Sequence, residues 1–378
     1  MKNKIFFVIF MFIWIILVVL NFVVPKISFS EQENRYLAKI PKFSFEKLVS
    51  GEYQEALDSY INDHFIFRNS WIRIKSQQER ILGKTEYNGV IFGKEGYLFE
   101  KFEYGVTEEK NIEIASDVVN KFVNSLDVNA GFDVPVYFAL VPNSIYINRE
   151  MLSEHYEVPN QSEIIKNFYS NLDGRIKAID VTEIMENNRD KYIYFKTDHH
   201  MTSNGAYLVY TEFTNVKGDD ILPLEKYSPQ IVSNEFLGTF DSKAQRFNQE
   251  KDYIVIYNND YNTNIVEAKY DNEITKSIYN SDYLNKKDKY SFFLNGNNSN
   301  VVIKTKVENG KRILLIKDSY AHIMAQFLCN DYEEIHLIDP RYYRASITEY
   351  VKKNNIDEVL FLYNVSNLCT DVGIRNVK

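Results

Sequence analysis

The chain has 378 residues, of which 45% are hydrophobic and 25% charged, and its formal net charge is −8 at pH 7. This composition is typical of a globular protein with one large or two moderate domains, and the negative charge argues against a nucleic-acid groove. Cys329 and Cys369 are the only cysteines, so a thiolate zinc site is not expected. The two thiols can form one disulfide or remain buried and free.

The N-terminal segment is the most apolar part of the chain. Lys2 and Lys4 precede residues 5–24, which are apolar apart from one asparagine. About twenty such residues span the hydrocarbon core, and the preceding lysines favour a cytoplasmic N-terminus. We therefore expect residues 1–25 to be a retained signal anchor, so that the protein is a single-pass protein of the cell membrane and mostly extracytoplasmic. The alternative is a signal peptide cleaved near residues 28–30, although its apolar core would be unusually long.

The pattern up to residue 107 is mostly helical. Apolar residues recur at helical spacing over residues 45–83. The stretch Gly93-Lys94-Glu95-Gly96-Tyr97-Leu98 predicts a hairpin turn, with glycines where a positive φ is needed. We expect residues 26–107 to form a helical stem and a hairpin.

From residue 108 onwards, predicted helices and strands alternate. The predicted helices are residues 108–126, 162–172, 203–214, 320–328 and 345–353. The predicted strands are residues 135–141, 176–181, 192–195, 312–316, 334–338 and 359–363. This alternation predicts an α/β domain over residues 108–378, with a mostly parallel sheet covered on both faces.

Residues from about 215 to 310 interrupt the alternation. They are rich in Asn, Asp and Tyr, with short β-like pieces at residues 253–257 and 291–294. We expect an insertion or lid, whose loop at residues 236–241 is able to approach a site.

Three residues form a candidate catalytic set. Ser319 follows a buried strand and precedes a helix, where ligands bind in open α/β sheets and helix amides can stabilise an oxyanion. Alone, this position fits a helix N-cap better. Asp198 and His200 are two residues apart, so in an extended segment they point to the same side, while His199 should point the other way. A serine nucleophile needs a base that is held by a third group, and His200 and Asp198 can fill these roles.

A divalent metal ion is the main alternative for the loop that carries Asp198, His199 and His200. Adjacent residues seldom converge on one ion, and the other histidines show no obvious ligand spacing; these are His64, His155, His322 and His336. We expect neither a metal ion nor another cofactor.

Several short blocks of the chain resemble the DHHW family and, more widely, SGNH-hydrolase-like proteins of the alginate O-acetyltransferase group. Besides the glycine-containing turn, the blocks are Glu33-Asn34-Arg35, Pro142-Asn143-Ser144, Asp198-His199-His200, Lys317-Asp318-Ser319-Tyr320 and Asp339-Pro340-Arg341-Tyr342-Tyr343. In the named motif a Trp follows the two histidines, whereas this chain has Met201. That difference leaves the Asp-x-His pair intact.

The resemblance implies a three-layer α/β/α SGNH-hydrolase-like sandwich with a triad of Ser319, His200 and Asp198. We add Asn143, Tyr320 and the backbone N–H groups near Ser319 and Tyr320 as oxyanion-hole or substrate-binding candidates. Arg341 is a candidate contact for an anionic donor or glycan, although pairing with a carboxylate explains it slightly better.

The activity implied by the resemblance is extracytoplasmic O-acetylation of a cell-surface or secreted polysaccharide. A multispanning membrane acyltransferase would supply the acetyl groups. The same triad would make a carbohydrate acetylesterase if water were the acceptor. A non-catalytic glycan-binding or assembly protein and a metal-dependent hydrolase are the remaining alternatives.

Overall fold

A computed structural model describes residues 2–33, 35–130, 134–153 and 156–378 of the chain, so Asn34 and His155, both named above, lie outside the described residues. The chain divides into two compact units, Met1–Asn88 with Asp241–Gln249, and Gly89–Phe240 with Glu250–Lys378. The hairpin grouped above with the stem lies in the second unit. The domain boundaries near residues 25 and 107 stay a prediction.

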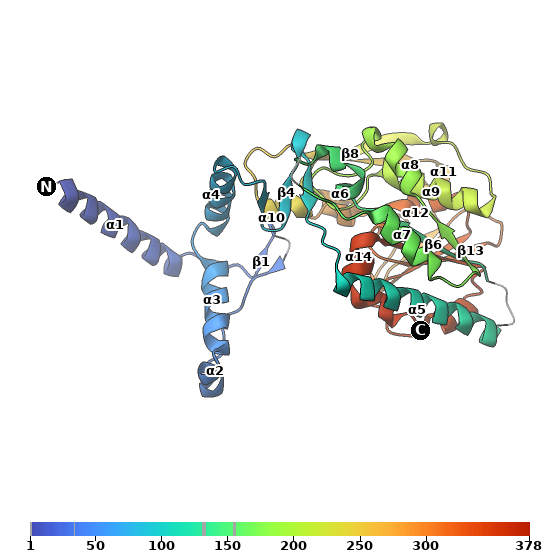
Figure 1. Ribbon diagram of the computed structural model, residues 1–378, viewed down its shortest axis with the longest axis horizontal. Helices are drawn as coiled ribbons and strands as arrows, with labels where there is room; N and C mark the ends of the chain where they lie inside the picture. The colour runs from blue at the N-terminus through green and yellow to red at the C-terminus, as the bar shows by residue number, and fades with distance from the viewer. Residues whose placement is uncertain (1, 34, 131–133, 154–155) are drawn as a thin grey trace. The chain divides into compact units, whose positions relative to one another are not determined.

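The first unit is mainly helical. Its helix α1 (Lys2–Val23) contains Lys4–Val23, the one stretch in the described chain long and apolar enough to cross a membrane. The predicted helical region forms α2 (Phe45–Ser50), α3 (Glu52–His64) and α4 (Arg68–Ile81), labelled in Figure 1. Gly51 ends α2 with a φ of 87°, a left-handed conformation that glycine adopts without steric cost. The strands of this unit are β1 (Phe29–Ser30), β2 (Arg35–Tyr36) and β3 (Glu86–Tyr87).

An eight-stranded sheet with the order β11-β10-β12-β14-β13-β15-β6-β7 organises the second unit. Five adjacent strands are parallel: β14 (Glu334–Ile338), β13 (Arg312–Lys317), β15 (Glu358–Asn364), β6 (Val136–Val141) and β7 (Ile176–Ile179). At one edge, the antiparallel strands are β12 (Asn300–Lys304), β10 (Glu267–Lys269) and β11 (Ile274–Thr275). The predicted mixed α/β fold with a mostly parallel sheet is therefore confirmed.

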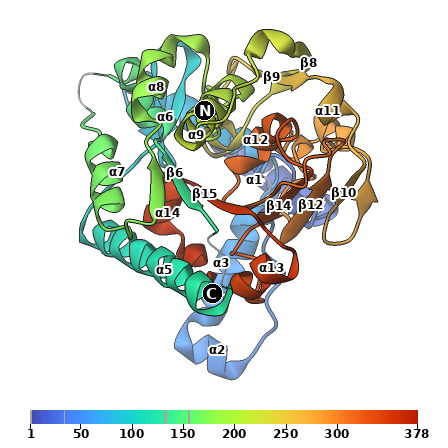
Figure 2. The ribbon, with the colours of Figure 1, turned by 90° about the vertical axis from the view of Figure 1, so that its right-hand side faces the viewer.

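Helices cover both faces of this sheet (Figure 2). Leu314 and Ile316 of β13 face a core shared with α5 (Val106–Ala130), α7 (Gln161–Ser170), α13 (Ile347–Lys353) and α14 (Val365–Thr370). Ile313 and Leu315 face the opposite core, which contains α9 (Ser203–Lys217) and α12 (Ala321–Leu328). Successive strand residues thus enter different cores, which explains the continuous apolar runs in the sequence.

The segment from 215 to 310 contributes both a ribbon and the edge of the main sheet. Strands β8 (Ser228–Phe236) and β9 (Asp252–Asn258) pair antiparallel, whereas β10, β11 and β12 extend the main sheet. The break in the alternation therefore marks in part a change from parallel to antiparallel strands. Four short helices lie in the connections: α6 (Ser144–Ile147), α8 (Thr182–Asn187), α10 (Thr239–Ala244) and α11 (Asp260–Thr263). Within α10, the chain passes from the second unit to the first at Asp241.

Two of the predicted strands are wrong. Residues 192–195 contain only an isolated bridge between Tyr194 and Met201, because the chain turns back immediately. Residues 291–294 contain the end of a 3-10 helix (Tyr290–Phe292) and a bridge from Phe293 to Tyr279. Both segments are apolar because they are buried, and a short apolar run does not identify a strand.

The predicted hairpin consists of β4 (Val90–Phe92) and β5 (Leu98–Glu100). Only one of its two glycines needs a positive φ: Gly96 has a φ of 81°, whereas Gly93 has −84°. A Cβ at Gly93 would lie 2.6 Å from the Phe99 ring, so this glycine is explained by close packing. The Leu98 N–H donates to the carbonyl of Lys196 (2.8 Å), which joins the hairpin to the loop carrying Asp198.

Candidate active site

Polar residues line up where four parallel strands end. Asp339 follows β14, Ser319 stands two residues after β13, Asn364 ends β15, and Asn143 stands two residues after β6. The carboxyl ends of parallel strands share one edge of a sheet, which is where open α/β folds bind ligands. Ser319 therefore lies within a row of polar groups at that edge.

The loop that contains Asp198 is a tight turn. The Phe195 N–H donates to the carbonyl of His200 (3.2 Å), which closes the turn. Within it, one oxygen of Asp198 accepts the backbone N–H of His200 at 3.0 Å and its ring Nδ1 at 2.6 Å. Asp198 and His200 thus meet through an Asx-type turn and not through the alternation of an extended strand.

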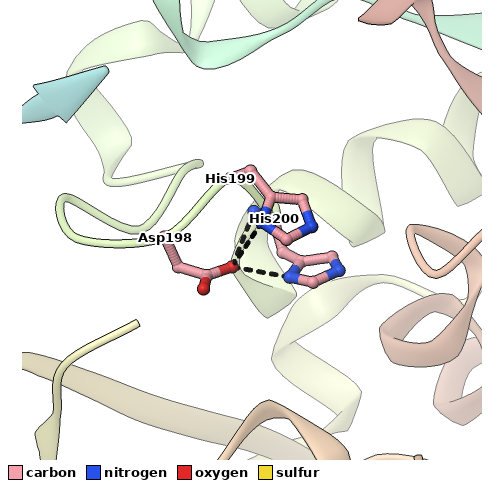
Figure 3. Close-up of side chains that lie close together, drawn as sticks. All are labelled: Asp198, His199 and His200. Atoms are coloured by element: carbon pink, nitrogen blue, oxygen red, sulfur yellow. Dashed lines mark hydrogen bonds and ion pairs between the residues drawn. The ribbon is translucent and has the colours of Figure 1, made fainter. Parts of the chain in front are cut away.

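The expected orientation of His199 is wrong for the same reason. Its Nδ1 lies 3.4 Å from the same Asp198 oxygen, and its ring centroid lies 3.8 Å from that of His200. Figure 3 shows both imidazoles beside one carboxylate oxygen. In a turn, neighbouring side chains need not point in opposite directions.

Ser319 completes a chain of hydrogen bonds with these residues. Its Oγ lies 2.8 Å from Nε2 of His200, although 119 residues separate them in the sequence. Because Nδ1 of a neutral ring donates to Asp198, Nε2 is free to accept the serine hydroxyl. The structure therefore brings together the three residues of the predicted triad, and their catalytic role stays a prediction.

Burial and neighbouring charges set the ionisation of this chain. Burial raises the pKa of Asp198, but the two histidine rings and hydrogen bonds from His200 and the Thr239 N–H outweigh it and hold the pKa below its usual value. Burial, followed by the effect of His199, lowers the pKa of His200 to about 4 against the opposing effect of Asp198. His200 is thus neutral near pH 7, as a general base must be.

Two elements far along the chain hold the turn. Asp252 of β9 accepts the backbone N–H groups of Lys196 and Thr197, each at 2.8 Å, and the Thr197 hydroxyl at 2.5 Å. Gly238 lies against Asp198, where a Cβ would approach a carboxylate oxygen to 2.3 Å. The loop at residues 236–241 does approach the site, whereas the sequence contained no signal for Asp252.

A buried carboxylate fixes the turn that carries Ser319. One oxygen of Asp318 accepts the Tyr320 N–H (2.8 Å). The other accepts the Asn364 N–H and side-chain amide (2.9 and 2.7 Å) and the Asn367 side-chain amide (2.9 Å). The turn is thereby tied to β15 and α14.

The oxyanion-hole candidates differ in what their donors already bind. The Tyr320 N–H is bound by Asp318, and its hydroxyl donates to the carbonyl of His199 (2.5 Å). The Asn143 amide donates to Asn364 (3.1 Å). The Ser319 N–H has no acceptor within the described part of the chain. The binding roles of Asn143 and Tyr320 stay predictions.

Arg341 is held in an ion pair. Its Nε and Nη2 donate to the two oxygens of Asp339 at 2.9 and 2.7 Å. Its side chain is 26% exposed and is therefore only partly buried. This is the carboxylate pairing considered above, and a contact with donor or glycan stays a prediction.

The metal alternative concerns the same loop. Among the residues described, Asp198, His199 and His200 form a group with possible ligand atoms within 4.8 Å of one another. However, the 2.6 Å between Asp198 and His200 is a hydrogen-bond distance. Two ligands on a tetrahedral ion with bonds of about 2.1 Å would lie about 3.4 Å apart. The geometry therefore fits a hydrogen-bonded pair better than shared ligation.

Comparisons with known proteins identify relatives of the chain. Residues 86–338 match the family model described as DHHW protein. A DHHW family protein from Eubacterium siraeum DSM 15702 has a similar structure, with a TM-score of 0.66 and 23% identity over 77% of this chain and 96% of that one. Bacillus cereus PatB1, whose structure was determined with a sulfonyl adduct, gives a TM-score of 0.65 and 20% identity over 76% of this chain and 98% of that one. No curated protein matches the chain. Since the matched family model spans more than half of the sequence, the chain belongs to the DHHW protein family.

Proposed function

We propose that the protein is an O-acetyltransferase of the SGNH-hydrolase-like type, which acts outside the cytoplasm on a cell-surface or secreted polysaccharide. The observation that carries the proposal is the hydrogen-bond chain from Ser319 Oγ through His200 to Asp198, with distances of 2.8 and 2.6 Å. A buried serine at a strand end, beside a neutral imidazole that a carboxylate orients, is suited to nucleophilic acyl transfer.

The first half-reaction transfers an acetyl group to the enzyme. Ser319 Oγ attacks the acetyl carbonyl of the donor while its proton moves to Nε2 of His200. The imidazolium is stabilised by Asp198 and returns the proton to the leaving group as the donor's acyl bond breaks. The Ser319 N–H is the available backbone donor for the developing oxyanion.

The second half-reaction transfers the group to the acceptor. A sugar hydroxyl gives its proton to His200 and attacks the acetyl-serine. The bond to Ser319 Oγ then breaks, and the serine recovers its proton from His200. The products are the O-acetylated sugar and the free serine, so no cofactor is consumed.

Several findings support this assignment. The chain has the fold of a DHHW family protein and of PatB1, over more than nine-tenths of both of those chains. The PatB1 structure holds a sulfonyl adduct, and we propose that the same class of reagent modifies Ser319 here. The polysaccharide acceptor and the membrane acyltransferase that supplies acetyl groups follow from the resemblance to the alginate O-acetyltransferase group.

The test of the triad uses the full chain in detergent micelles and an acetyl ester reporter. We expect Ser319→Ala to lower the rate by at least about 1000-fold, because the nucleophile is lost. Ser116→Ala is the matched control, since Ser116 is also buried but lies on α5 and donates to Glu113. Both variants should unfold at the temperature of the natural protein. A Ser319→Ala rate equal to that of the control would refute the triad.

A transferase and an esterase differ in the molecule that accepts the acetyl group, which is a sugar hydroxyl for the first and water for the second. With a soluble oligosaccharide present, a transferase gives acetylated sugar by mass spectrometry in a Ser319-dependent way. Release of acetate alone, at a rate that the oligosaccharide does not change, would assign an acetylesterase to the same triad.

A further inference from the structure

Tyr290 is a buried residue of the inserted segment that contacts two members of the proposed triad. Its ring lies on the His200 imidazole with a centroid distance of 3.5 Å and an interplanar angle of 8°. Its hydroxyl donates to the backbone carbonyl of Ser319 at 2.9 Å. One side chain thus holds both the base and the segment that carries the nucleophile.

Tyr290 is itself held rigidly. It begins a 3-10 helix, Tyr290–Phe292, and only 5% of it is exposed. Phe195 packs edge-on at 6.5 Å, Phe293 lies at 5.6 Å, and the His322 ring lies nearly parallel at 6.0 Å. Such packing restricts the side-chain torsions of Tyr290, so its ring is a fixed wall for the imidazole.

The two faces of the His200 ring meet different surroundings. His199 covers one face, is 32% exposed, and lines a pocket together with Asn143, Phe240 and Ser366. Tyr290 closes the other face with a buried ring. Water that reached this second face would let the imidazole rotate and would compete for its nitrogen atoms.

We propose that Tyr290 is a positioning residue, which fixes the plane of His200 so that Nε2 meets Ser319 and Nδ1 meets Asp198. The proposal rests on the function proposed above. It means that the inserted segment completes the site, because the wall behind the base comes from residue 290 and not from the parallel sheet.

Substitution of Tyr290 should change the rate at which Ser319 is modified, and it should do so in a way that general destabilisation of the protein would not. Misplacing a catalytic group by about 1 Å can cost about 100-fold. We expect Tyr290→Leu to slow modification of Ser319 by a sulfonyl fluoride by at least about 30-fold. Tyr290→Phe keeps the ring and loses one hydrogen bond, for which about a fivefold loss is expected.

The pH dependence should change in the Leu variant only. His200 is neutral down to low pH in part because it is buried, so the acid limb of the modification rate should move from about 4 towards 6.5 when water reaches the ring. The titratable or charged groups around His200 are Asp198, His199, Tyr290, Tyr320, His322 and Arg341. The substitution removes only Tyr290, whose hydroxyl is uncharged in this pH range because burial raises its pKa, so a moved limb reports on solvent access.

The experiment compares four full-length proteins in detergent micelles: natural, Tyr290→Phe, Tyr290→Leu and Tyr270→Leu. Tyr270 is the matched control, since it is a buried tyrosine of the same insertion whose hydroxyl donates to Ser277. Modification is located by peptide mass spectrometry, and His200 is titrated by NMR. The control should stay within about twofold of the natural rate. Should Tyr290→Leu fail to fold, Tyr290→Met replaces it, because a flexible side chain fills irregular space.

A Leu or Met variant with the natural rate and an unmoved acid limb would overturn the positioning role while leaving the triad intact. If the natural protein is not modified at Ser319, the proposed function fails instead. The NMR titration then decides the role of Tyr290 alone, and an unchanged pKa of His200 in the variant overturns it.

Discussion

Asp198 is charged and His200 is neutral at neutral pH, although both side chains are buried. Burial disfavours the charged form of either group, but Asp198 is compensated by two rings and a backbone N–H, whereas His200 has only Asp198 to favour its charge. The pair is therefore a carboxylate beside a neutral imidazole. That state is ready to accept a proton without prior ionisation.

The pH–rate profile tests this state. With a pKa of about 4, His200 remains neutral at pH 5, so kcat/KM for an acetyl ester should be flat between pH 5 and 7 and fall below about 4. An unperturbed imidazole would lower the rate about 30-fold at pH 5. Asp331→Asn is the control, because burial raises the pKa of Asp331 to about 6 and its titration could affect stability in the same range. A limb near 6.5 in both proteins would contradict the expected ionisation.

The lowered pKa of His200 also makes the stability of the folded chain depend on pH. Above pH 6.5 the ring is neutral in both the folded and the unfolded chain. Between pH 6.5 and 4 the unfolded chain binds a proton at His200 that the folded chain does not. The free energy of unfolding therefore decreases as the pH falls through this range. The site therefore adds to acid sensitivity although its activity is expected to tolerate acid.

How much of the site could be predicted differs between residues. Asp198, His200 and Ser319 stand out because their residue types can form a triad, and Ser319 also follows a buried strand. Tyr290 and Asp252 do not, because neither belongs to a recognisable catalytic set, and nothing in the sequence indicates that they contact Ser319 and Thr197, 29 and 55 residues away. Periodicity reports which face of an element is buried, and it does not report which distant side chain meets it.

At the scale of elements, the loop before α10 is as important as the strand ends. Gly238 and Thr239 close over Asp198, and the Thr239 N–H donates to its second oxygen at 2.7 Å. The glycine is needed here for space, because its φ is not in the left-handed region. Any side chain at this position must displace the carboxylate or the loop.

We accordingly expect Gly238→Ala to lower the acetyl ester rate by about 100-fold, because the Cβ pushes Asp198 away from His200. Gly174→Ala is the matched control, since a Cβ there meets no atom within 4 Å and its φ is not positive. The measurement is kcat/KM for both variants, together with their melting temperatures. Natural activity in a folded Gly238→Ala protein would show that the contact is not required.

The strands that are buried on both faces could be predicted from the sequence. Strands β6, β13, β14 and β15 are long apolar runs between turns, and the sequence places them to within one or two residues. Strand β12, which lies between β10 and β14, was missed because only alternate residues of Asn300–Lys304 are buried. A strand that is buried on one face only does not form a continuous apolar run, and the pairing partner β14 comes later in the chain.

At the scale of the molecule, the two units differ in how their apolar side chains are covered. The second unit encloses two apolar cores around one sheet, and the candidate active site lies wholly within it. The first unit begins with α1, whose large apolar side chains are exposed, including Phe6, Phe10 and Trp14. A surface of this length and composition is stable in lipid and unfavourable in water. This contrast supports the proposal that α1 anchors a catalytic unit at a membrane.

Fractionation of cells that produce the full chain tests whether α1 is a membrane anchor. Lys4–Val23 comprises 20 residues, which at about 1.5 Å per residue span the hydrocarbon core. We expect the chain to resist alkaline carbonate extraction and to keep its mass of 44.5 kDa. Protease added to intact spheroplasts should digest it, because the lysines before α1 keep only the N-terminus inside. Ile13→Lys with Ile16→Lys is the matched control, since each charge at the centre of the span costs about 3 kcal/mol and should release the protein. A mature chain that begins near residue 30 would show instead that α1 is a cleaved signal peptide.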